Sequence, residues 1–199
     1  VVVIDSEVSD TEAVVSTIVS DNYDAGVQCA KDMMKKKTSA NIIIVNQKAL
    51  NSINERVKGF RDTIKGHPQY KIVEEKESAA EFEIAMKVME EIIYEKKNYD
   101  VVMGGNDPIA LGCIAAMQMT DKTDQVMVYG VDGSPDGKAM IKAGFLEGTA
   151  AQSPIKIGEK AVQTAYSYLA GETVKKHVTI PVELITADNL KLYDMTGWQ

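Results

Sequence analysis

Residues 100–119, DVVMGGNDPIALGCIAAMQM, indicate the fold class most directly. It opens on a short apolar run at 100–103, and the sequence Asn106-Asp107-Pro108 that follows is typical of a helix N-terminus. We expect Asp107 to be the N-cap and Pro108 the first helical residue, because apolar residues then recur at spacings of three and four. A buried strand that leads directly into a helix is the repeating unit of an α/β sheet.

The same unit recurs along the chain. Further apolar runs lie at VVVI (1–4), VVSTIV (14–19), NIIIV (41–45), YKIV (70–73), VMVYGV (126–131) and GTAA (148–151). Several are continuously apolar, as expected for parallel strands covered on both faces. Helix starts are indicated by a capping box of Ser78 and Glu81, by Ser134-Pro135 and by Ser153-Pro154. The pattern predicts a doubly wound parallel sheet with right-handed crossovers.

The pattern changes after Gly171. Two β-rich runs, at 177–186 and 189–195, follow with no helix between them. We therefore expect the sheet to be largely complete by residue 151 and the remainder to belong to a second body. The chain also opens in mid-strand without an initiator Met, which suggests a piece of a longer protein.

Composition excludes several classes of protein. The 199 residues carry 22 Lys+Arg against 29 Asp+Glu, a net charge of −7, so the chain is expected to repel nucleic acid. No stretch approaches the ~20 apolar residues of a membrane helix.

Cys29 and Cys113 fall in helical patterns and are interpreted as free buried thiols, with neither a disulfide nor a metal site expected.

Polar residues follow the apolar runs directly, at the rim where an open parallel sheet binds its ligands. The rim set comprises Asp5, Ser6, Ser20, Asp21, Asn22, Asn46, Gln47, Asn51, Ser52, Arg56, Asn106, Asp107, Asp132 and Gln152. Carboxylates, amides and a guanidinium together suit a neutral polyhydroxylated ligand, because each hydroxyl can both donate and accept. Taken singly, most of these residues are better explained as a cap, a turn or a solvated charge, and Asp132 is explained equally well as a turn residue.

No catalytic signature is present in the sequence. It lacks the nucleophile elbow, the P-loop and the dinucleotide fingerprint. DGSPDG (132–137) fails as a calcium loop because Ala143 stands at its twelfth position. His67 and His177 are expected in loops without catalytic partners. The sequence therefore predicts binding without catalysis, cofactor or metal.

Six motifs in order carry a family resemblance: ID (4–5), SDN (20–22), NERVKGF (54–60), GGNDPIALG (104–112), YGVDGSPDGKAMI (129–141) and GTAAQSPIKIGEKAV (148–162). They resemble the second half of the type I periplasmic sugar-binding proteins, most closely the ribose-binding group. The resemblance implies two α/β lobes, joined by three crossing segments, that close on a monosaccharide. It also implies a preceding portion on the order of 100 residues.

The resemblance implies a division of this chain. Residues 1–6 would end the N-terminal lobe at the hinge, and 7–151 would form the C-terminal lobe. Residues 152–181 would hold a crossing segment and a helix of the N-terminal lobe. Residues 182–199 would return to the C-terminal lobe and end as a tail near the hinge.

The resemblance also implies which residues bind ligand. The matched positions are Asp5, Arg56, Asn106, Asp132 and Gln152, with Ser6, Asn51 and Ser52 as further candidates. Ser6 stands where ribose binders have Arg, Val131 replaces an aromatic residue, and the stacking aromatic falls near Ala80. These departures leave another pentose, a hexose, a polyol or a furanose-like signal molecule open.

The expected role is that of an extracytoplasmic solute-binding protein that delivers a monosaccharide or polyol to an ABC permease. It would lie in the periplasm or at the outer membrane face, with any lipid anchor outside this chain. Alternatives are the effector domain of a lac-repressor-type regulator and the ectodomain of a sugar-sensing kinase. The C-terminal TIPVELITADNLKLYD (179–194) favours the transporter group.

Overall fold

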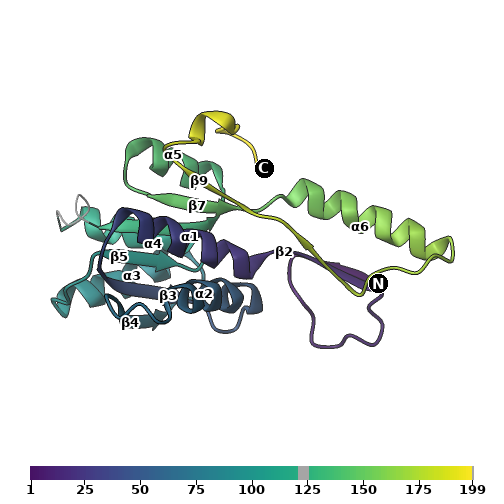
Figure 1. Ribbon diagram of the computed structural model, residues 1–199, viewed down its shortest axis with the longest axis horizontal. Coiled ribbons are helices and arrows are strands. Elements are labelled where there is room, and N and C mark those ends of the chain that lie inside the picture. Colours follow the sequence, from purple (N-terminus) through teal and green to yellow (C-terminus); the bar gives the residue numbers. More distant parts are fainter. Residues whose placement is uncertain (121–125, 199) are drawn as a thin grey trace.

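A computed structural model describes residues 1–120 and 126–198. Its elements are β1 (Val2–Ile4), β2 (Ser16–Ser20), α1 (Asn22–Lys36), β3 (Ala40–Asn46), α2 (Asn51–Ile64), β4 (Tyr70–Glu77), α3 (Phe82–Tyr94), β5 (Val101–Gly104), α4 (Asp107–Gln118), β6 (Met127–Asp132), α5 (Pro135–Ala143), β7 (Gly148–Ala151), α6 (Pro154–Leu169), β8 (His177–Ile180), β9 (Glu183–Thr186) and the 3-10 turn η2 (Leu190–Leu192). Within the described residues the strands form two sheets (Figure 1).

The larger body consists of a six-stranded sheet, in the order β4-β3-β5-β6-β7-β9, with helices α1 to α5. Neighbouring strands run parallel, except that β9 runs antiparallel to β7. Every residue of β5 is buried, so helices cover both faces of the sheet. One helix layer pairs α1 with α2, and the other pairs α3 with α4 and α4 with α5. The predicted doubly wound α/β fold is confirmed.

The smaller body consists of the parallel sheet β1-β2-β8 with helix α6. Ile157 of α6 packs against Ile18 and Ile180, which form a separate small core. Strand β2 was expected in the C-terminal lobe, within residues 7–151, and this expectation is wrong because β2 pairs with β1 and β8. The remaining lobe boundaries stay a prediction.

Hydrogen bonds tie together the segments that cross between the bodies. Ser20 Oγ, at the end of β2, donates to Gln152 Oε1 at 2.8 Å. The Asp21 amide donates to the Ile180 carbonyl at 2.9 Å. These bonds join the segments that follow β2, β7 and β8, so the connection between the bodies is narrow but ordered (Figure 1).

Two predicted helix caps are wrong. Asn106 is the N-cap of α4, its Oδ1 accepting from the Ile109 amide at 3.0 Å, and Asp107 is already helical. Ser78 and Glu81 make no capping box, because the Ser78 amide still donates to Asn46 of the sheet and α3 begins only at Phe82. By contrast, α5 starts directly after Ser134, as predicted, and its C-cap is Gly144, which has a φ of 82°.

The C-terminal stretch also differs from expectation. His177 begins strand β8 instead of lying in a loop. The run at 189–195 forms the short turn η2 and no strand. Among the described helices, none combines the length and apolar character needed to cross a bilayer.

Candidate binding site

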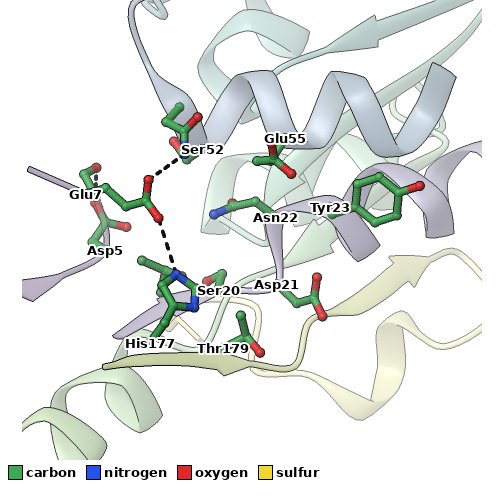
Figure 2. Close-up of a pocket in the computed structure, with 13 residues that line it drawn as sticks. Asp5, Glu7, Ser20, Asp21, Asn22, Tyr23, Ser52, Glu55, His177 and Thr179 are labelled. Atoms are coloured by element: carbon green, nitrogen blue, oxygen red, sulfur yellow. Dashed lines mark hydrogen bonds and ion pairs between the residues drawn. The ribbon is translucent and has the colours of Figure 1, made fainter. Parts of the chain in front are cut away.

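A cleft of about 270 Å³ lies where the two bodies meet. It is bordered by the loop after β1, the start of α1, the first turn of α2 and strand β8 (Figure 2). Its lining residues are polar except for Val19, and four of the residues predicted to bind ligand take part: Asp5, Ser6, Asn51 and Ser52. The rest of its polar wall comprises Glu7, Ser20, Asp21, Asn22, Tyr23, Glu55, His177 and Thr179.

Glu7 links the two bodies across this cleft. Its Oε2 accepts from Asn51 Nδ2 of α2 at 2.8 Å, and its Oε1 lies 3.4 Å from His177 Nε2 of β8. Figure 2 shows the Glu7 carboxylate extended between these two elements. Sequence reasoning missed both Glu7 and His177, because nothing local marks a loop residue that reaches a distant strand.

Arg56 is held rigidly behind the cleft wall. It projects from α2 and its side chain is only 5% exposed. Its Nε donates to Asn22 Oδ1 at 2.9 Å and its Nη1 to the Gly105 carbonyl at 3.0 Å. The same Nη1 lies 3.5 Å from Asp132 Oδ1, so the buried guanidinium has a carboxylate partner.

Gln152 extends this polar network toward the hinge. Its Nε2 donates to Asp132 Oδ1 at 2.8 Å, while its Oε1 accepts from Ser20 Oγ. A continuous chain of contacts thus runs from Asn22 through Arg56, Asp132 and Gln152 to Ser20. Three of the five residues predicted as ligands are brought together here, and Asp5 lies at the cleft beside them.

Asn106 is placed differently. Its side chain caps α4 and also donates from Nδ2 to the Ala80 carbonyl at 3.4 Å. The structure therefore gives it a capping role, and its role as a ligand stays a prediction.

Asp107 supports the turn that carries Asp132. Its carboxylate is fully buried and accepts from the Ser134 amide at 2.9 Å, from Ser134 Oγ at 2.6 Å and from Thr149 Oγ1 at 2.6 Å. Thr149 Oγ1 in turn accepts from the Gly133 amide at 3.0 Å. Asp132 itself has a φ of 142°, a conformation that needs such support.

Burial sets the electrostatics of these acids. Desolvation, with Asp132 close by, raises the pKa of Asp107 to about 7, against the opposing effect of its hydrogen bonds. Desolvation also raises the pKa of Asp132, although Arg56 and the bonds from Gln152 and the Asp107 backbone act to lower it. The pKa of Arg56 is lowered by burial and held up by Asp132 and Asp5.

This arrangement offers acceptors and donors within one ordered network. A hydroxyl placed against Asp132 and Gln152 could donate to the carboxylate and accept from the amide. Groups already fixed by mutual hydrogen bonds lose little freedom on binding, which favours affinity. The chemistry suits recognition of several neighbouring hydroxyls.

The chain is similar in sequence to known proteins of one family. Residues 1–173 match the family described as periplasmic binding protein domain. The chain is 31% identical over 175 residues to the ribose import binding protein RbsB of Salmonella typhimurium, covering 86% of this chain and 58% of that protein. It is also 31% identical over 196 residues to the D-apiose import binding protein of Paraburkholderia graminis, covering 96% of this chain and 62% of that protein.

The fold is also similar to that of a solved solute-binding protein. An ABC transporter solute-binding protein from Bacillus halodurans, with bound myo-inositol, superposes with a TM-score of 0.89 at 25% identity, covering 96% of this chain and 67% of that one. The chain spans about 58% of the length of the ribose import binding protein. By sequence match and by fold, the chain belongs to the periplasmic binding protein family.

Proposed function

We propose that this chain is part of an extracytoplasmic solute-binding protein that captures a neutral monosaccharide or polyol and delivers it to an ABC permease. The observation that carries the proposal is the buried network of Arg56, Asp132 and Gln152 beside Asp5. Relatives that import ribose and D-apiose support the class of ligand. In this role the polar groups bind and orient hydroxyls, and no bond of the sugar is broken.

Capture is proposed to proceed by closure. Asp5 directly follows β1 of the smaller body, whereas Arg56 and Asp132 belong to the larger body. A sugar that contacts both sets favours the conformation in which they face one another, so ligand shifts the population toward the closed form. The permease would then recognise the closed form.

A thermal-shift screen against D-ribose, D-apiose, myo-inositol and sugar phosphates tests the class of ligand. A ligand that binds only the native state stabilises it by about 2.7 kcal/mol at a hundredfold excess over Kd. We expect a rise in Tm with a neutral sugar or polyol. A rise with sugar phosphates alone would contradict the proposed class.

Asp132→Asn tests the site itself. The carboxamide keeps the shape but removes the charge, so we expect affinity for the sugar found in the screen to fall about 10- to 100-fold. The matched control is Asp136→Asn, the same change at an exposed position of α5. Asp132→Asn binding as tightly as this control would exclude Asp132 as a ligand, and circular dichroism checks that both variants fold.

A further inference from the structure

A second cavity, of about 350 Å³, shares Asp5 with the binding cleft. Its wall combines the site residues Asp5 and Gln152 with four apolar residues: Ile4, Pro154, Ile157 and Trp198. Trp198 is the only tryptophan of the chain and comes from the C-terminal tail. The cavity is thus polar along one border and apolar along the others.

The tail that presents Trp198 is anchored in the larger body. Lys138 of α5 is fully buried, and its Nζ donates to the carbonyl of Asp194 and, at 2.6 Å, to that of Gly197. The Thr196 amide and hydroxyl each donate to Asp194 Oδ1 at 2.9 Å, which fixes the turn before Trp198. A buried ammonium is tolerated only with such partners, so the tail and α5 hold each other in place.

Residue Trp198 is nevertheless 49% exposed. A large aromatic surface therefore stays uncovered beside a carboxylate and an amide. Small-molecule sites combine apolar and aromatic walls with a few polar groups in the same way. A sugar ring has the complementary construction, with hydroxyls around its edge and an apolar C–H face.

We propose that Trp198 contacts the bound sugar, its indole covering the C–H face of the ring whose hydroxyls pair with Asp5 and Gln152. The inference rests on the proposed function and adds to it a residue and a subsite. A ring with a continuous apolar face is favoured over one whose hydroxyls interrupt both faces.

The test compares Trp198→Ala and Trp198→Phe by isothermal titration with D-ribose, D-apiose and myo-inositol. We expect the alanine variant to bind about tenfold more weakly and the phenylalanine variant to stay within about threefold of the unaltered protein. Tyr94→Ala is the matched control, because Tyr94 is a strongly exposed aromatic on α3 of the larger body. It should bind normally.

Sugar binding by the unaltered protein distinguishes failure of the proposed function from failure of the Trp198 contact. Binding of none of these sugars by that protein would overturn the proposed function and this inference together. Normal binding by the unaltered protein and by Trp198→Ala alike would overturn the Trp198 contact alone. A lower Tm with unchanged sugar affinity in Trp198→Ala would also overturn the contact. Trp198 would then stabilise the fold by covering Ile157 without binding the sugar.

Discussion

The larger and smaller bodies use the same strand–helix unit but differ in how completely they bury it. Strand β5 of the larger body is buried at every residue, between helix layers on both faces of the sheet. In the smaller body β1 is only partly buried, and Leu169 of α6 is 81% exposed. Within this chain the larger body therefore has the more complete hydrophobic core.

The difference extends to the binding site. Arg56 and Asp132 in the larger body are fixed by a network of hydrogen bonds, while Asp5 extends from a three-residue strand of the smaller body. One side of the site is thus preorganised and the other is carried on a less buried sheet. In the closing mechanism proposed above, these two walls would move relative to each other.

A matched pair of core substitutions is expected to give the largest difference in stability between the two bodies. Ile44 on β3 and Ile18 on β2 are both fully buried, but Ile18 packs in a small core with Ile157 and Ile180. We expect Ile44→Ala to lower the free energy of unfolding by about 2–5 kcal/mol and Ile18→Ala to fall at or below the lower end of that range. The smaller core can relax around the lost methyl groups.

Urea unfolding monitored by circular dichroism measures both losses. A loss for Ile18→Ala as large as that for Ile44→Ala would show that the smaller body carries an equal share of the stability, contrary to the comparison above.

The buried carboxyl of Asp107 gives the larger body a predicted pH dependence. Burial raises the pKa of Asp107 to about 7 in the native state, whereas an unfolded chain releases this proton near pH 4. Between these values the native state holds a proton that the unfolded state lacks. The contribution of Asp107 to the free energy of unfolding therefore falls as the pH rises from about 4 to about 7.

Asp107→Asn tests this sign, because the neutral carboxamide mimics the protonated acid. Across that pH range we expect the free energy of unfolding of the unaltered protein to fall relative to that of the variant, by on the order of a few kcal/mol. Asp136→Asn serves again as the exposed control. Parallel stability–pH curves for Asp107→Asn and the unaltered protein would refute the assignment.

Comparison with the sequence shows which features can be derived from local patterns. The strands and helices follow from runs of apolar residues and their spacing, so the α/β fold was predicted. Strand β2 was assigned to the wrong lobe because its pairing with β8, about 160 residues away in the chain, is a long-range choice. A local pattern identifies a strand but not its neighbour.

The site shows the same limit. Arg56, Asp132 and Gln152 were predicted from the family resemblance and do meet in one network. Asp107 was interpreted as a cap, because a carboxylate before Pro108 looks the same in sequence whether it faces solvent or the core. Trp198 has no local signal, since only the fold brings the tail back to Gln152.

The smallest expected effect comes from a comparison of helix caps in the two bodies. Asn106 caps α4 with a hydrogen bond to the Ile109 amide, whereas Ser153 stands at the start of α6 with no side-chain cap bond. Removing a cap bond costs about 1 kcal/mol, and replacing an N-cap residue that makes none costs a few tenths. We therefore expect Asn106→Ala to lower the free energy of unfolding by about 1 kcal/mol and Ser153→Ala by less than about 0.5 kcal/mol.

Both variants should be measured by urea unfolding without sugar, since Asn106 is also a predicted ligand and bound sugar would mix the two roles. Equal losses would mean that Ser153 stabilises α6 by another route, and that the smaller body holds its helix as firmly as the larger one. A larger loss for Asn106→Ala than for Ser153→Ala would instead mean that the cap hydrogen bond stabilises the larger body, with no equivalent in the smaller one. In that case the sheet and helix of the smaller body, which carries Asp5, would depend more on packing at the hinge.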